Sequence, residues 1–118
     1  MKENMINVPE LHQSSIIIDA HSDAIGDSLG LWVKEERPLG KRSTWGQFDI
    51  PRAMEGGLTA ILLAISYYPQ LGGSPARQAL RFIDAFYEEI EQNSDRVMLA
   101  LTADDILKAK QQNKTSPC

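Results

Sequence analysis

The alternation of apolar and polar positions along the chain predicts short strands separated by helices. Residues 16–20 form a β-branched run that ends in polar residues, which is typical of a strand buried on both faces in a parallel sheet. Residues 58–67 are a second apolar run of strand length, and residues 97–101 are expected to be extended. Together these runs predict an α/β fold with a parallel sheet.

Capping residues predict three helices. Asp49 and Pro51 open a short helix, which Gly56 stops because glycine readily takes a positive φ. Ser74, followed by a proline, opens the longest helix, in which apolar residues recur at three- and four-residue steps as far as Ile90. Residues 102–105 resemble a capping box and predict a helix that runs to about Ala109.

Two segments lack such regularity. Residues 26–48 contain glycines, basic residues and two isolated tryptophans without a sustained period, so we expect a long loop with at most a short helix. Loops of this length in a compact domain tend to be functional. Residues 111–118 are polar and offer no core residue, and we expect this tail to fray.

The composition is that of an ordinary soluble protein. Of 118 residues, 42% are hydrophobic and 24% are charged, and the net charge is −4. No basic cluster exceeds Lys41-Arg42, which argues against nucleic-acid binding. The single cysteine, Cys118, cannot form an intrachain disulfide. No secretory signal or membrane-spanning run is present, so we expect a cytoplasmic protein that binds neither nucleic acid nor a membrane.

Candidate chemistry lies where the first predicted strand ends. Asp19, His21 and Asp23 are two residues apart and should share one face, about 6 to 7 Å from one another at each step. At the carboxyl end of a parallel strand, an imidazole and a carboxylate on one face can chelate a divalent metal. The alternative is a solvated strand end at which His21 bonds to a loop. Asp19 follows three isoleucines, so it should be partly buried and needs a partner: a backbone N–H, a basic side chain or a metal-bound group.

Two blocks of sequence resemble a known family. Residues 17–23 read I-I-D-A-H-S-D, close to that family's first-strand pattern V-I-D-G-H-N-D. Residues 48–58 read F-D-I-P-R-A-M-E-G-G-L, close to F-D-I-P-R-L-R-x-G-G-V, and residues 94–96 and 101–106 continue the match. The family is that of the renal (membrane) dipeptidases, metal-dependent enzymes of the amidohydrolase type built on a (β/α)8 barrel.

The resemblance implies a fold and an activity. Residues 1–118 would be an incomplete, N-terminal portion of a single (β/α)8 barrel domain of the metallo-dependent hydrolase (amidohydrolase) type. The complete enzyme would be a zinc-dependent dipeptidase with a two-metal site, and a homodimer is left open for it. By resemblance, His21 and Asp23 are metal ligands, and Asp19 is a supporting residue rather than a ligand.

The remaining ligands of the family have no counterpart in this sequence. They are a bridging Glu at the end of the third strand and His residues on later strands. We therefore expect no catalytic residue within this chain and no dipeptidase activity from the chain alone.

Other residues that could carry chemistry receive commoner structural roles. His12 is interpreted as a loop histidine, Asp49 as a helix-start carboxylate and Arg52 as an exposed arginine, although either of the last two could contact substrate. Trp32 and Trp45 are expected to pack the long loop, and Lys41-Arg42 to lie in a solvated turn.

Two other functions compete with the dipeptidase hypothesis. One is a non-catalytic small α/β module that binds a protein partner, in which His21 and Asp23 are incidental. The other is a phosphoacceptor domain, which would need a second acidic strand end, and the sequence shows none. Metal affinity distinguishes the dipeptidase hypothesis from the binding module.

Overall fold

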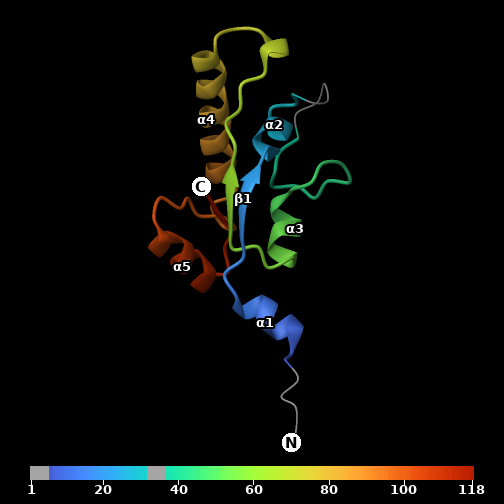
Figure 1. Cartoon of the computed structure of the whole chain (residues 1–118), viewed down its shortest axis with the longest axis vertical. Helices are drawn as coiled ribbons and strands as arrows, with labels where there is room; N and C mark the ends of the chain where they lie inside the picture. The colour runs from blue at the N-terminus through green and yellow to red at the C-terminus, as the bar shows by residue number, and fades with distance from the viewer. Residues whose placement is uncertain (1–5, 32–36) are drawn as a thin grey trace, which may run out of the picture.

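The computed structural model describes residues 6–31 and 37–118, which form a parallel sheet flanked by helices (Figure 1). The strands β1 (Ile18–Ser22), β2 (Ala60–Leu63) and β3 (Ser116–Pro117) lie side by side in that order. Both pairings are parallel. The predicted parallel α/β sheet is therefore confirmed.

Helices connect and flank the strands. In the view of Figure 1, α2 and α3 lie on one side of β1 and β2, and α4 and α5 on the other. No helix among residues 6–31 and 37–118 combines the length and the apolar character that a membrane crossing needs. The helices are α1 (Val8–Ser14), α2 (Ala24–Ser28), α3 (Ile50–Glu55), the short 3-10 helix η1 (Pro69–Leu71), α4 (Pro75–Gln92) and α5 (Ala103–Gln111).

Three predicted helix starts are confirmed. The Asp49 side chain caps α3 by accepting a hydrogen bond from the backbone N–H of the third helical residue, and Ser74 does the same for α4. Thr102 and Asp105 form the reciprocal capping box of α5. These signals are local in sequence, so the pattern alone was sufficient to locate them.

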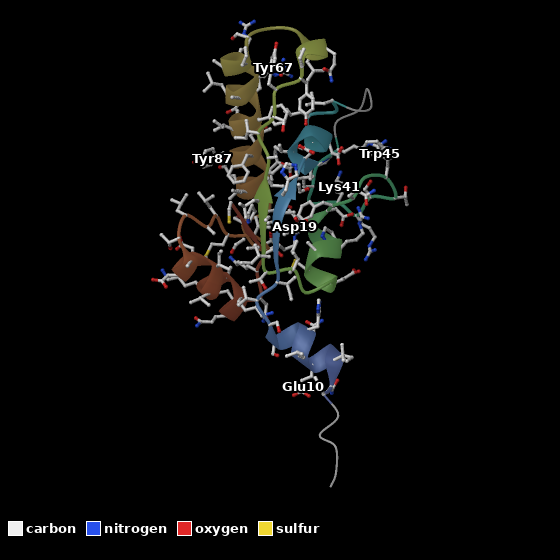
Figure 2. All side chains as sticks on the ribbon, viewed as in Figure 1. Glu10, Asp19, Lys41, Trp45, Tyr67 and Tyr87 are labelled. Atoms are coloured by element: carbon white, nitrogen blue, oxygen red, sulfur yellow. The ribbon has the colours of Figure 1, made fainter. Side chains whose placement is uncertain are left out.

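Two details of α3 and α4 differ from what the sequence pattern suggests. Gly56 keeps a negative φ of −75°, and the positive φ of 75° belongs to Gly57. In α4 the apolar repeat is only partly buried, because Phe86 and Ile90 pack against the core whereas Leu80 is 67% exposed. Figure 2 shows Tyr87, which is also exposed, on the outer side of α4, and Leu80 and Tyr87 line one surface groove. The helix therefore has apolar residues on both its inner and outer faces.

The strands are shorter and less buried than predicted. β1 begins two residues later than expected, and Ile18 is 49% exposed. β1 lies at an edge of the sheet, and β2 is its only neighbouring strand among the described residues. The prediction that this strand is buried on both faces is therefore wrong. The second strand ends at Leu63, although Ala64 N–H still donates to the Ser22 carbonyl at 2.8 Å.

The expected fraying of residues 111–118 is wrong, because the end of this segment forms β3. Ser116 N–H donates to the Thr59 carbonyl at 2.8 Å, and Cys118 N–H donates to the Ile61 carbonyl at 2.9 Å. Thr115, like Ser116, is buried. Backbone pairing with β2, which side-chain hydrophobicity does not reveal, orders this segment. Burial also raises the pKa of the Cys118 thiol.

Helix α4 fixes the segments that surround the end of β1. Its residues Phe82 and Ala85 pack on Ile25 of α2. The buried Glu89 carboxylate accepts hydrogen bonds from the Ser28 hydroxyl at 2.6 Å and from Leu39 N–H at 3.0 Å. Because one carboxylate binds both α2 and the backbone at Leu39, these two points are held in a fixed relation to α4.

Candidate functional site

A cleft of about 1020 Å³ opens beside β1, and we call it the β1 cleft. Its walls come from β1, from the start of α2, from residues 44–49 and from α3. Asp19, His21 and Asp23 all line it, so the three side chains that the sequence predicted to share one face do lie together. Other residues of the lining are Asp27, Trp45, Asp49 and Arg52.

His21 and Asp23 approach each other at the open side of this cleft. The His21 ring nitrogen Nε2 lies 3.4 Å from Asp23 Oδ2, and the two side chains are 69% and 48% exposed. His21 is in β1, whereas Asp23 lies just beyond it at the N-cap position of α2. The pairing of β1 with β2 also shifts register before Ser22, so the meeting of the two side chains owes as much to this irregular strand end as to regular alternation.

Asp19 is exposed, so the expectation that it is partly buried is wrong. Its Oδ1 accepts a hydrogen bond from the backbone N–H of His21 at 3.0 Å. A backbone N–H is one of the three partners that the sequence suggested. Figure 2 shows Asp19 on β1, the edge strand whose exposure explains the difference. The contact ties the carboxylate to the residue that carries the imidazole.

The second oxygen of Asp23 faces the segment after β2. Its Oδ1 accepts hydrogen bonds from the Tyr68 hydroxyl at 3.2 Å and from the Ser66 hydroxyl at 3.4 Å. Burial and the Asp23 carboxylate raise the pKa of Tyr68, against a lowering by its hydrogen bond with Ser66. Neither Tyr68 nor Ser66 was predicted from the sequence as a site residue. Both carry hydroxyl groups and stand at alternate positions after a strand, in a region that is otherwise largely apolar. This spacing could have indicated that they share one face.

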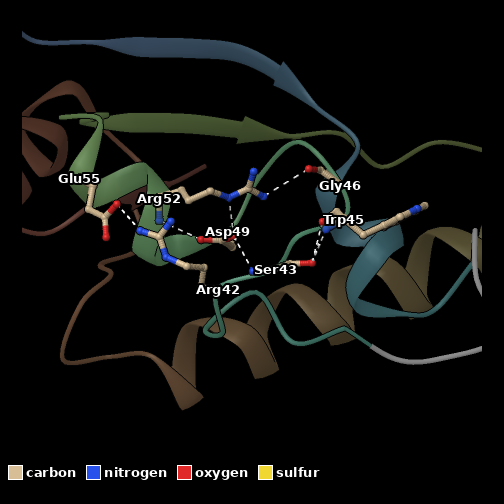
Figure 3. A network of polar contacts seen from close by, with 7 residues as sticks. All are labelled: Arg42, Ser43, Trp45, Gly46, Asp49, Arg52 and Glu55. Carbon is tan, nitrogen blue, oxygen red and sulfur yellow. Dashed lines mark hydrogen bonds and ion pairs between the residues drawn. The ribbon is translucent and has the colours of Figure 1, made fainter.

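A polar network forms the wall opposite β1 (Figure 3). The buried Asp49 carboxylate accepts hydrogen bonds from Ser43 N–H at 3.0 Å and Arg52 N–H at 2.8 Å, and from Arg52 Nε at 2.6 Å. Burial alone would raise the pKa of Asp49, but these hydrogen bonds and the guanidinium charge outweigh it and hold that pKa below its usual value. Arg52 also donates to the Gly46 carbonyl at 3.3 Å.

The network confirms the helix-start role of Asp49 but revises that of Arg52. The Arg52 side chain is 34% exposed, so it is half-buried rather than a surface arginine. Its charge is balanced by Asp49 within the wall. Arg42 pairs with Glu55, and both side chains are exposed, which agrees with a solvated turn.

The remaining candidate residues lie around the cleft or away from it. The Arg37 guanidinium lies 4.4 Å from the ring centre of Trp45, a side chain that lines the cleft and is 40% exposed. Trp32 lies outside the described residues. His12 is on α1 rather than in a loop, and its Nε2 lies 2.7 Å from the Gly56 carbonyl, which explains why it takes no part in the site.

Asp27 is a further carboxyl group in the cleft, which the sequence analysis did not single out. Burial raises its pKa, and the nearby Asp23 raises it further, while Arg37 lowers it. Asp27 has therefore a weaker preference for the ionised form than an exposed aspartate.

His21 Nε2 and Asp23 Oδ2 are placed as two ligands of one metal ion would be. Zinc takes imidazole nitrogen and carboxylate oxygen at about 2.0 to 2.2 Å, and two such donors on a tetrahedral ion are about 3.4 Å apart. The observed separation of His21 Nε2 and Asp23 Oδ2 is 3.4 Å. Within residues 6–31 and 37–118, no group of three or more His, Cys, Asp or Glu side chains is arranged to hold a metal. The pair therefore matches part of a metal site.

Comparisons with solved structures identify longer proteins with the same fold. An amidohydrolase from Pseudomonas aeruginosa is 28% identical over 92% of this chain, with a TM-score of 0.59. The probable dipeptidase PvdM from Pseudomonas aeruginosa is 16% identical over 92% of the chain, with a TM-score of 0.70. The chain spans only 26% and 28% of the length of these two proteins. They confirm the predicted fold class, a portion of an amidohydrolase-type (β/α)8 barrel.

A family model, but no curated protein, matches this chain. The family model described as membrane dipeptidase (peptidase family M19) matches residues 5–117, which is nearly the whole chain. The chain therefore belongs to the membrane dipeptidase family.

Proposed function

We propose that this chain contributes the first metal ligands, His21 and Asp23, to a zinc-dependent enzyme that hydrolyses dipeptides. The observation that carries the proposal is the 3.4 Å separation of the two donor atoms at the open side of the β1 cleft. Family membership supports the reaction class. When bound, zinc supplies a Lewis acid that polarises the scissile carbonyl and lowers the pKa of water.

The other residues of the cleft position these ligands and shape the space for substrate. Asp19 holds the backbone N–H of His21 and so restrains the end of β1. Trp45 provides an apolar wall. The volume of about 1020 Å³ is at the upper end of small-molecule sites and accommodates a dipeptide with surrounding water.

We also propose that the 118 residues alone do not turn over dipeptides. A catalytic zinc ordinarily has three protein ligands, and the described part of this chain offers two side chains that converge. An ion held by two ligands keeps more of its water, and its position over the cleft is poorly fixed. Hydrolysis therefore requires metal ligands in addition to His21 and Asp23.

The test combines binding and turnover on the purified chain. Zinc is added first and then an alanyl dipeptide, while the amide signals of cleft residues are followed by NMR. We expect zinc to shift the signals of His21 and Asp23, the dipeptide to shift those of Trp45 and Gly46 only with zinc present, and hydrolysis to stay at background. Absence of any dipeptide effect would contradict the substrate proposal. Turnover that His21→Ala abolishes would contradict the proposed inactivity of the chain alone.

A further inference from the structure

The Asp23 carboxylate does not cap helix α2, although its position in the chain favours that role. Asp23 occupies the N-cap position of α2, where an aspartate usually accepts a hydrogen bond from a backbone N–H of the first turn. Its side chain makes no such bond. The two oxygens instead face different partners: Oδ2 faces His21, and Oδ1 faces Tyr68 and Ser66. The carboxylate is thus held by hydrogen bonds at Oδ1, while Oδ2 faces the His21 ring.

Helix α4 holds Tyr68 in place independently of Asp23. The buried Gln78 side chain accepts a hydrogen bond from Tyr68 N–H at 2.8 Å and donates one to the Tyr68 carbonyl at 2.9 Å. The Tyr68 ring stacks on Phe82, with ring centres 6.0 Å apart and planes 19° from parallel. Both the backbone and the ring of Tyr68 are therefore fixed, and its hydroxyl has a defined place beside Asp23.

We propose that Tyr68, assisted by Ser66, is a positioning residue that holds Oδ1 of Asp23 so that Oδ2 is presented to the metal. The inference rests on the metal site of the proposed function. A carboxylate that is free to rotate about its Cβ–Cγ bond exchanges its two oxygens, whereas hydrogen bonds to one oxygen assign the other to the ligand role. Mutation of a residue that hydrogen-bonds to a metal ligand commonly lowers metal affinity by about 10- to 100-fold.

The effect of the Tyr68 hydroxyl can be measured separately from the effect of its ring packing. Tyr68→Phe removes the donor to Asp23 and keeps the ring that stacks on Phe82 and the backbone bonds to Gln78. Tyr67→Phe is the matched control, because it removes a hydroxyl from the adjacent residue. Tyr67 is 47% exposed, and its hydroxyl makes no hydrogen bond within the described part of the chain.

The experiment measures cobalt(II) binding to the whole chain, because cobalt occupies zinc sites and its visible absorption reports the geometry of the ligands. We expect Tyr68→Phe to weaken cobalt binding by about tenfold or more and to alter the absorption spectrum. Tyr67→Phe should match the wild type in both. Thermal midpoints without metal show whether each variant is folded.

Ser66→Ala provides a second route to the same conclusion, because it removes the weaker donor to Asp23, together with the hydrogen bond between Ser66 and Tyr68, and keeps the Tyr68 hydroxyl. A smaller loss of affinity is expected, with the same direction of spectral change. Wild-type affinity and spectrum in both folded variants would overturn the inference while leaving the metal site in place. If the wild type and His21→Ala bind cobalt equally, the proposed function itself fails, so the two failures are distinguishable.

Discussion

Arg52 Nε lies 2.6 Å from Oδ2 of Asp49, a carboxylate that is 1% exposed. The same carboxylate caps α3 and accepts the backbone N–H of Ser43. One side chain therefore joins the loop before α3 to the helix itself. Because both segments line the β1 cleft, the shape of the cleft depends on this contact.

Replacing Asp49 should destabilise the protein markedly. Asp49→Ala removes the helix cap and leaves the half-buried Arg52 guanidinium without its counter-charge, at a cost of about 2 to 4 kcal/mol in the free energy of unfolding. Urea denaturation measures the change. Asp95→Ala is the control, because Asp95 is 77% exposed and its variant should stay within about 0.5 kcal/mol of the wild type. Equal effects of the two substitutions would refute the role of Asp49.

The low pKa of Asp49 predicts a loss of stability in acid. Its pKa is lower in the folded chain than the usual value of about 3.9 for an unfolded chain, so the ionised group contributes stability above that pH. The contribution is lost as the pH falls through the folded pKa. Urea midpoints from about pH 6 to pH 2 should therefore fall less steeply below about pH 4 in Asp49→Asn than in the wild type. Parallel curves would show that Asp49 does not titrate in this way.

Features set by neighbouring residues were predictable from the sequence, and features set by distant pairing were not. Ser74 and Thr102 marked their helices correctly because a cap acts within one turn. Ser116 gave no such signal, since the carbonyl that accepts from its N–H belongs to Thr59, a residue far away in the sequence that directly precedes β2. The exposure of Ile18 was equally hidden, because it depends on which segments cover β1.

The same distinction applies to the candidate site. His21 and Asp23 are two residues apart, so the strand pattern predicted that they share one face, but their close approach also depends on the irregular end of β1. Tyr68 reaches Asp23 from a segment 45 residues further along the chain, and only the folded arrangement shows the contact. Asp49 was predicted as a helix-start carboxylate and Arg52 as an exposed arginine, but their joint network in the wall of the cleft was not predicted.

The ordering of the C-terminal segment gives a prediction for hydrogen exchange. The amides of Ser116 and Cys118 donate to the carbonyls of Thr59, just before β2, and of Ile61, within β2. They should exchange about tenfold or more slowly than the amide of Asp104. Asp104 lies in the first turn of α5, where helix N–H groups lack an intrahelical acceptor. NMR-detected exchange makes the comparison. If the amides of Ser116 and Cys118 exchange as fast as that of Asp104, the C-terminal segment is frayed and this prediction is wrong.

Zinc calorimetry on the whole chain tests the metal site most directly. The variants are His21→Ala and Asp23→Ala, and the controls are His12→Ala and Cys118→Ser, which remove the other histidine and the cysteine. We predict weak binding of one zinc, because two protein ligands leave the remaining positions to water, with loss in both ligand variants and no change in the controls. Equal affinity in the wild type, His21→Ala and Asp23→Ala would place any bound metal elsewhere and contradict the assignment of His21 and Asp23 as ligands.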